Sequence, residues 1–356
     1  MVIRRRRVPY PAAVAVTGAG LGLGRALVER LMARPDVPLV VGLDVVPAAV
    51  AGVEWRAGDL RAPGLAGSLT GIGTVVHLGM SYDIAAPAGP RREHTVRGTA
   101  ALLEAAREAG VLRVVLVTSV DVHAAPPGGG LPLSEDLPLR AHPDSALTGD
   151  LLEVERLADH ATRTGLEVVV LRPAPLVAGP LGPAYDGALL HSLAGPRLLA
   201  VRGVEPVWQV CHSEDLLSAL ELAATGAVGG AAVVASAGWL TQREVEQLSG
   251  QRRLELPASV ALSTAERLHR AGLTPGTPAE LDRLLSPLVV EPQRLTAAGW
   301  TPAWTAADAI AAHLAGRAAP TARPGVYTAA GTAAGATVAL MGTAALVRRA
   351  RRRRRS

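Results

Sequence analysis

The sequence lacks lysine and phenylalanine altogether and contains one cysteine in 356 residues. The absence of lysine excludes every reaction mechanism in which a lysine side chain is the base, the nucleophile or the activating cation. Cys211 has no second cysteine with which to form an intramolecular disulfide. This cysteine usage indicates a reducing compartment, and we expect a cytoplasmic protein.

Aromatic residues make up 3% of the chain, and positive charge gathers at its two ends. Eleven of the 36 arginines lie in residues 4–7 and 348–355, so the rest of the chain has 25 arginines against 31 acidic residues. A surface for nucleic acid requires a basic face with rings on which bases stack. We therefore expect no nucleic-acid partner.

Several catalytic signatures are also absent from the sequence. The nine histidines and the cysteine show no HxxxH, HExxH or CxxC spacing, so no metal site is expected. No serine has the flanking glycines of a nucleophile elbow. The basic N-terminus is followed by no adequate apolar stretch, so we expect no secretory signal peptide.

Apolar runs with strand character are present, and amphipathic helical patterns separate most of them. The runs cover residues 12–17, 38–44, 73–79, 112–119 and 166–173, and the clearest helical patterns cover 24–34 and 97–110. Near-continuous apolar strands that alternate with helices predict a parallel sheet with helices on both faces. The expected fold class is α/β, with a Rossmann-type doubly wound parallel sheet, a smaller C-terminal substrate lobe and a C-terminal hydrophobic helix.

The turn after the first run reads TGAGLGLG, with four glycines in residues 17–24. Such a turn between a strand and a helix lets the backbone approach a pyrophosphate, which the free N–H groups of the helix stabilise. Asp44 closes the next apolar run, 20 residues after Gly24. A carboxylate there accepts hydrogen bonds from the ribose hydroxyls of NAD and repels the 2′-phosphate of NADP. NAD is therefore the expected cofactor.

The joint spacing of these and later motifs resembles the short-chain dehydrogenase/reductases, and over residues 12–315 their extended branch of NAD-dependent epimerases and dehydratases. TGAGLGLG fits the TGxxxGxG form of the classical branch, with Leu21 where the extended branch has its middle glycine. Three later segments are similar to the motifs NVxGTxxLLEAAxxxGVxRxVxxSS, LRPxxVYGP and FVHVDDLAxA, and they cover residues 94–119, 171–180 and 210–220.

The resemblance implies which residues surround the cofactor. GDL at 58–60 is similar to the pair that contacts adenine, and VVHLG at 75–79 is similar to the strand end that approaches the nicotinamide ribose. Thr95 stands at the usual asparagine of the first long motif. The expected cofactor-binding residues are Gly18, Gly20, Leu21, Gly22, Leu23, Gly24, Asp44, Asp59, Leu60, Leu78, Gly79 and Thr95.

The resemblance also implies hydride chemistry by a serine, a tyrosine and a lysine, and two of these three are missing. Ser119 matches the serine, whereas SALTGDLLEVERLA at 145–158 has Leu147 at the tyrosine and Leu151 at the lysine. Ser119 and His123 are the candidate catalytic residues, the latter because a histidine titrates near neutrality. The structural alternatives are a serine that caps a buried strand end and an ordinary loop histidine.

Two classes of function remain open at this point. The missing tyrosine and lysine favour a dinucleotide-binding sensor or scaffold, because losing an acid/base group costs about 10²–10⁴ in rate. The retained substrate-lobe motifs and Ser119 favour an oxidoreductase or epimerase that acts, with substitute groups, on a sugar-nucleotide-like or other hydroxyl or carbonyl substrate. Tyr82 and Tyr185 are the tyrosines placed to supply such a group. Whether the protein is an enzyme, and which small molecule it binds, stay open.

We expect four regions along the chain: a basic leader at 1–10, a NAD-binding domain at 11–175, a substrate lobe at 176–318 that partly returns to the sheet, and an Ala/Gly-rich tail at 319–356. Residues 325–347 carry no charge and are long enough to cross a bilayer, and Gly331 and Gly335 form a GxxxG pair. We therefore expect membrane association through residues 325–355, by a spanning or an interfacial helix. A disordered tail is the alternative, and a homodimer stays open.

Overall fold

The computed structural model describes residues 13–45, 50–84, 86–124, 130–140, 146–177, 190, 193, 197–270 and 288–318. Their largest feature is a seven-stranded sheet with the order β11-β6-β5-β4-β1-β2-β3. Its strands are β1 (Ala13–Thr17), β2 (Val40–Asp44), β3 (Glu54–Ala57), β4 (Ile72–His77), β5 (Arg113–Val117), β6 (Glu167–Pro173) and β11 (Ala231–Val234). All neighbouring strands are parallel, and the order reverses between β1 and β4, as in a doubly wound sheet.

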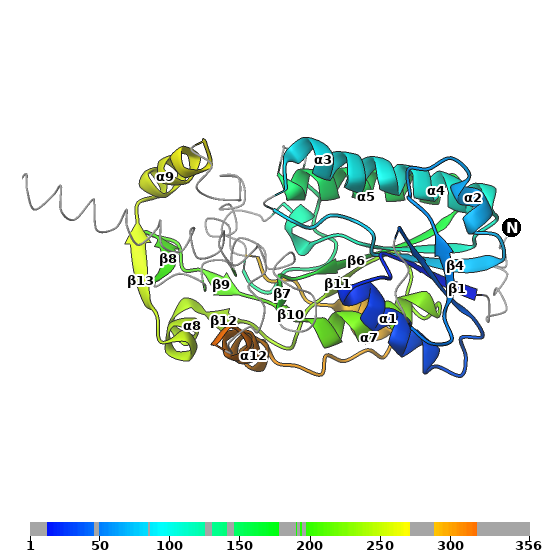
Figure 1. Cartoon of the computed structure of the whole chain (residues 1–356). Coiled ribbons are helices and arrows are strands. Elements are labelled where there is room, and N and C mark those ends of the chain that lie inside the picture. The colour runs from blue at the N-terminus through cyan, green and yellow to red at the C-terminus, as the bar shows by residue number, and fades with distance from the viewer. Residues whose placement is uncertain are drawn as a thin grey trace, which may run out of the picture.

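Helices cover both faces of this sheet (Figure 1). One face carries α1 (Gly22–Met32) and α7 (Ser213–Ala224), and the other carries α2 (Leu65–Ser68), α3 (Ala88–Arg92), α4 (Gly98–Glu108) and α5 (Leu147–Arg163). A π-helical turn, η1 (Glu93–Arg97), joins α3 to α4 without a break. The α/β fold with a Rossmann-type parallel sheet is therefore confirmed.

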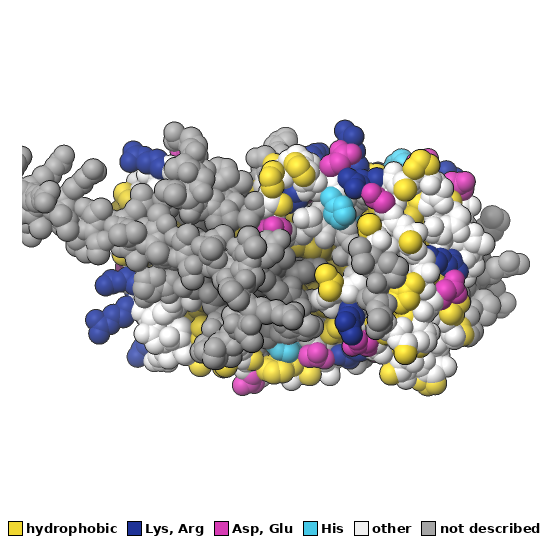
Figure 2. All heavy atoms as spheres, viewed as in Figure 1, with side chains coloured by type: hydrophobic (Ala, Val, Ile, Leu, Met, Phe, Trp, Pro, Cys, Tyr) yellow, Lys and Arg dark blue, Asp and Glu magenta, His cyan; other side chains and the backbone are white. Residues whose placement is uncertain are grey.

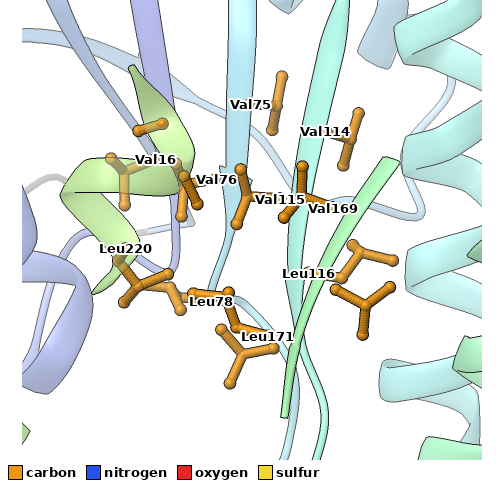
Figure 3. Close-up of a cluster of buried hydrophobic side chains, with 14 of the residues drawn as sticks. Val16, Val75, Val76, Leu78, Val114, Val115, Leu116, Val169, Leu171 and Leu220 are labelled. Atoms are coloured by element: carbon orange, nitrogen blue, oxygen red, sulfur yellow. The ribbon is translucent and has the colours of Figure 1, made fainter. Parts of the chain in front are cut away.

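The main hydrophobic core lies between the sheet and these helices. Strands β1, β4 and β5 are buried at every residue, which explains their near-continuous apolar sequences. Figure 3 shows Val16, Val76, Val115 and Val169, from four neighbouring strands, together with Leu220 of α7. Complete burial of such a side chain contributes about 1.5–3 kcal/mol. The loops at the ends of these strands are thus held by the most buried part of the molecule.

A second, smaller core lies in the C-terminal lobe, at the end of the molecule that carries β13 and α9 (Figure 1). Its short ladders pair β7 (Leu176–Val177) with β10 (Cys211–His212), β8 (Arg197–Val201) with β13 (Arg252–Leu256), and β9 (Val207–Trp208) with β12 (Leu240–Thr241). The helices of this lobe are α8 (Gln242–Ser249), α9 (Ala258–Arg270) and α12 (Ala306–Ala318), whereas α11 (Gln293–Ala297) places Leu295 in the main core. Trp208 is fully buried in this core and donates its Nε1–H to Gln242 Oε1 at 2.8 Å.

Strand β11 belongs to the chain beyond residue 175, yet it completes the large sheet beside β6. Its register aligns Ala231 with Val170 and Val234 with Pro173. The chain therefore leaves the sheet after β6 and returns to it after α7. The boundary between the NAD-binding domain and the substrate lobe at residue 175 stays a prediction.

The surface of the sheet-bearing half mixes charges of both signs. On the face shown in Figure 2, arginine and acidic side chains lie next to one another, with hydrophobic side chains between them. Among the described residues, exposed charges form pairs one helical turn apart, such as Arg97 with Glu93 and Arg163 with Asp159. Exposed pairs of this kind contribute only about 0.3–0.5 kcal/mol each, so they add little to the stability of the fold.

The expected transmembrane helix requires correction. Among the described residues, no helix combines the length and the apolar composition that a bilayer crossing needs. Residues 325–355, on which the expectation rested, lie outside the described residues, as does Tyr185. The composition explains the error, because alanine, glycine and threonine dominate residues 325–347 and contribute little to insertion. The absence of charge over a length that could cross a bilayer thus does not by itself identify a transmembrane helix.

Candidate functional site

The glycine turn leads from β1 directly into α1. Gly18 (φ +65°) and Gly22 (φ +55°) adopt left-handed backbone conformations that glycine tolerates without strain. A Cβ on Gly24 would lie 2.0 Å from the carbonyl oxygen of Gly18, so α1 packs against the turn with no space for a side chain. Leu21 has an extended backbone and is 81% exposed. The turn therefore accommodates leucine at position 21 and requires glycine at positions 18, 22 and 24.

The start of α1 presents backbone N–H groups. Leu21 is the N-cap residue and makes no side-chain hydrogen bond, and the first turn contains no acidic side chain. Leu23, in contrast, is 2% exposed and anchors the helix in the core. The N–H groups and the dipole of such a helix end stabilise an anion. Together with the glycine conformations, this arrangement fits the phosphate groups of a dinucleotide.

Asp44 ends β2 beside the glycine turn. Its Oδ2 accepts a hydrogen bond from the backbone N–H of Gly20 at 2.9 Å, and its Oδ1 accepts one from the N–H of Val45 at 2.7 Å. The side chain remains partly exposed, and each carboxylate oxygen has capacity for a further hydrogen bond. The carboxylate is thus fixed against the turn at the place where the resemblance expects a ribose.

Asp59 and Leu60 follow β3 and differ in their surroundings. Asp59 accepts hydrogen bonds from the backbone and the guanidinium of Arg61, which lower the pKa of its carboxyl to about 2. Leu60 is 7% exposed, and its Cδ1 would lie 3.4 Å from a Cβ on Gly79. Leu60 therefore packs against the end of β4, while Asp59 stays charged and partly exposed.

Polar side chains join β1 to β4 at the point where the strand order reverses. Thr17 Oγ1 accepts the backbone N–H groups of Leu78 at 3.2 Å and Gly79 at 3.1 Å, and it lies 2.6 Å from His77 Nδ1. Because both acceptor positions of the hydroxyl are used, its proton is donated to Nδ1. His77 is fully buried, and burial, followed by the charge of His94, lowers its pKa to about 3. His77 is therefore neutral, with its proton on Nε2.

The same network continues towards the helices on one face of the sheet. His77 Nε2 lies 3.2 Å from Thr99 Oγ1, and the Thr99 hydroxyl donates to the carbonyl oxygen of Thr95 at 2.6 Å. Thr95, in η1, accepts the N–H of Ser81 at 3.1 Å and donates to its carbonyl at 3.3 Å. We call Thr17, His77, Thr99 and Thr95 the switch-point relay. Sequence reasoning selected only Thr95 from this relay, although polar residues within apolar strands were a visible signal.

Ser119 lies just after β5 and is partly exposed. Its Oγ accepts the backbone N–H of Asp121 at 3.1 Å and caps a short 3-10 turn, η2 (Val120–Val122). The preceding hydroxyl, Thr118, is buried and donates to Glu155 Oε1 at 2.7 Å. Ser119 thus has a capping role in the fold, and its catalytic role stays a prediction.

His123 is fully buried beside an ion pair. Arg172 donates from Nε and Nη2 to the two carboxylate oxygens of Glu155, at 2.9 and 2.8 Å. His123 Nδ1 lies 3.0 Å from the carbonyl oxygen of Leu137, and Nε2 lies 3.4 Å from Arg172 Nη1. Burial, followed by the charge of Arg172, lowers the pKa of His123. This geometry favours the structural alternative, and the catalytic role of His123 stays an untested prediction.

Apolar residues stand at the start of α5, near the end of β5. Leu147 is the first residue of α5 and packs against the main core, and Leu151 is 2% exposed within it. Tyr82 is 7% exposed, and its hydroxyl donates to the carbonyl oxygen of Val117 at 2.7 Å. The substitute tyrosine within the described chain is therefore already bound to the end of β5.

A family model described as the NAD dependent epimerase/dehydratase family matches residues 14–235, which run from β1 to just beyond β11. The chain belongs to this family. The expected cofactor, NAD, is confirmed at the level of the family. The individual cofactor-binding residues stay predictions, although the structure brings the glycine turn, Asp44, Leu78 and Gly79 together at one edge of the sheet.

Proteins similar to this epimerase/dehydratase family member include an uncharacterised protein of Mycobacterium tuberculosis, 28% identical over 261 residues that cover 70% of this chain and 68% of that protein. Among solved structures, MoeE5 in complex with UDP-glucuronic acid and NAD has a TM-score of 0.63 at 22% identity, with 85% of this chain and 98% of that chain covered. UDP-glucose 4-epimerase from Thermus thermophilus, in complex with NAD, has a TM-score of 0.61 at 21% identity, with 86% and 99% covered. These likenesses show the shared fold.

Replacement of Gly24 by alanine tests the packing of this family member's glycine turn. Alanine is the better helix former by about 1 kcal/mol, yet its Cβ would overlap the Gly18 carbonyl, which lies 2.0 Å away. We expect Gly24→Ala to lower the free energy of unfolding by about 1–3 kcal/mol in urea titrations. Gly67→Ala is the control, because nothing lies within 4 Å of its Cβ and alanine is expected to be neutral or stabilising. Equal effects of the two substitutions would contradict the close packing.

The neutral state of His77 predicts a pH dependence of stability. In the unfolded chain His77 binds a proton at its ordinary pKa of 6.5, whereas in the fold it does so only near pH 3. The unfolded state therefore binds more protons between these values, and stability is lost as pH falls from 6.5 towards 3, by up to about 1.4 kcal/mol per pH unit. We expect His77→Gln to reduce this slope in urea unfolding at a series of pH values. His160→Gln, on the surface of α5, should keep the wild-type slope.

Proposed function

We propose that this epimerase/dehydratase family member binds NAD in a retained site and acts as a dinucleotide-binding sensor or scaffold. The observation that carries the proposal is the pair Leu147 and Leu151, at the two positions that the resemblance assigns to the catalytic tyrosine and lysine. Both side chains pack with the main core instead of presenting polar groups. The glycine turn and Asp44, in contrast, keep the geometry that a dinucleotide requires.

The chemistry of hydride transfer supports the same proposal. Transfer between a hydroxyl group and a nicotinamide needs a group that exchanges the hydroxyl proton and a charge that stabilises the developing alkoxide. Leucine supplies neither. Arg172, the cation beside His123, is bound to Glu155 through two hydrogen bonds. The usual route of the family therefore lacks its proton donor and its cation.

Asp44 is expected to make the protein select NAD over NADP. Its carboxylate is held against the glycine turn by Gly20 and would repel a 2′-phosphate. We expect calorimetry to give tighter binding of NAD than of NADP, and Asp44→Ala to weaken NAD binding by about 10- to 100-fold, as for the loss of hydrogen bonds to a charged group. Asp36→Ala, an exposed carboxylate that pairs with Arg34, is the matched control. Equal or tighter binding of NADP by the wild type would overturn the assignment.

The sensor proposal predicts no measurable turnover. NADH absorbance should stay constant, and chromatography should show an unchanged sugar, when the wild-type protein is mixed with NAD and nucleotide sugars, such as the UDP-glucuronic acid bound by MoeE5, or with simple secondary alcohols. The double variant Leu147→Tyr/Leu151→Lys is expected to gain activity only if the substrate pocket has survived. Robust wild-type turnover would contradict the proposal.

The alternative function is an oxidoreductase or epimerase with substitute catalytic groups. The observation that favours it is Ser119, a partly exposed hydroxyl at the end of β5. Sugar nucleotides are the ligand class of this alternative, because MoeE5 was solved with UDP-glucuronic acid. Turnover that disappears in Ser119→Ala would support this function and replace the sensor proposal. The cytoplasmic location and the homodimer stay predictions under either function.

A further inference from the structure

The strand ends of the sheet offer a bound dinucleotide two sides of different chemistry. A doubly wound sheet holds a dinucleotide across its carboxyl ends, with one nucleotide on each side of the switch point between β1 and β4. The adenosine side comprises the ends of β1, β2 and β3 with the start of α1. The nicotinamide side comprises the ends of β4, β5 and β6 with the start of α5.

The adenosine side keeps groups that bind a ligand. The start of α1 presents N–H groups without a side-chain cap, and Leu21 at its N-cap is 81% exposed. Asp44 is fixed by two backbone N–H groups and remains partly exposed. This side therefore provides donors for phosphate oxygens and an acceptor for ribose hydroxyls.

On the nicotinamide side, three hydroxyl groups near the end of β5 form hydrogen bonds with the protein itself. Tyr82 donates to the carbonyl of Val117 at 2.7 Å, and Thr118 donates to Glu155 at 2.7 Å. The oxygen of Ser119 accepts the N–H of Asp121 at 3.1 Å. A ligand that used the donors of Tyr82 or Thr118 would have to break hydrogen bonds of the fold.

The buried cations on this side are paired as well. Arg172 lies 2.8 Å from Glu155, and Arg91 lies 2.8 Å from Asp150 in the first turn of α5. The side chains of Arg91 and Asp150 are 3% and 2% exposed. Removing either cation from its partner would leave an uncompensated buried charge, which is strongly unfavourable. These arginines therefore do not replace the missing lysine.

We propose that the site recognises the ADP-ribose half of a dinucleotide and derives little affinity from the nicotinamide half. The inference rests on the proposed function, because it concerns the ligand of the same site. NAD⁺ and NADH differ only in the nicotinamide ring, so the protein binds both alike. It is a receptor for ADP-ribose-containing nucleotides that does not report the redox state of the nicotinamide.

Calorimetry on the full chain tests this inference with NAD⁺, NADH, ADP-ribose and nicotinamide mononucleotide as separate ligands. We expect Kd values for the first three that agree within about threefold, and binding of the mononucleotide that is at least about 100-fold weaker. Asp44→Ala should raise the Kd of NAD⁺ and of ADP-ribose by the same factor. Asp36→Ala should leave both unchanged.

The outcomes separate this inference from the proposed function. ADP-ribose that binds about tenfold more weakly than NAD⁺, or a tenfold difference between NAD⁺ and NADH, overturns the inference and leaves NAD binding intact. Failure of all three to bind overturns both. Leu147→Tyr/Leu151→Lys, checked for folding by circular dichroism, should gain affinity for NAD⁺ and not for ADP, which lacks both the nicotinamide ring and its ribose. An equal gain for both ligands would contradict the division into two sides, and the wild-type comparison decides the matter if this variant does not fold.

Discussion

The hydrogen bond from Thr17 to His77 determines how the two halves of the sheet meet. Thr17 can accept two backbone N–H groups from the chain after β4 only because its own proton goes to a neutral His77. A charged histidine would present a donor at Nδ1, and the hydroxyl would have no acceptor left for its proton. Thr17 and His77 therefore join the end of β1 to the chain after β4, and Thr99 extends this network to Thr95 in η1.

The two sides of the switch point differ in whether their polar groups already have hydrogen-bond partners within the protein. Near the glycine turn, the N-terminal N–H groups of α1 have no side-chain cap, and the carboxylate of Asp44 is held in place but partly exposed. Near α5, ion pairs and hydroxyl groups satisfy one another, and leucines fill the rest. Such saturation stabilises the fold. Under the proposed function, the family scaffold is kept for binding while the polar groups near α5 are used by the fold itself.

The buried part of the fold could be predicted from the sequence. Strands β1, β2, β4, β5 and β6 are short, near-continuous apolar runs, which are typical of strands buried in a parallel sheet. Two strands of the large sheet, β3 and β11, were not predicted. Strand β3 reads EWRA at the edge of the sheet, where charged residues stay in water, and β11 is only four residues long. Strand β3 lacks the apolar density of a central strand, whereas β11 is apolar and lacks the length.

The candidate site also contains some residues that the sequence made predictable and others that it did not. Gly18, Gly24 and Asp44 were predictable because their spacing is local, whereas the bond between Thr17 and His77 joins residues 60 positions apart. The burial of Tyr82 and His123 also depends on distant partners, Val117 and Arg172. The sequence alone shows that such residues are near a strand end. It does not show whether their polar groups form hydrogen bonds with a distant part of the chain.

Strand β11 has a consequence for the synthesis of the protein. Because it comes about 60 residues after β6, the outer edge of β6 has no partner strand while the intervening chain is made, a period of about 3–12 s at usual translation rates. During that time the newly made sheet has an open edge that can pair with other chains. The nascent protein is therefore exposed to misassembly at this edge between the synthesis of β6 and the synthesis of β11.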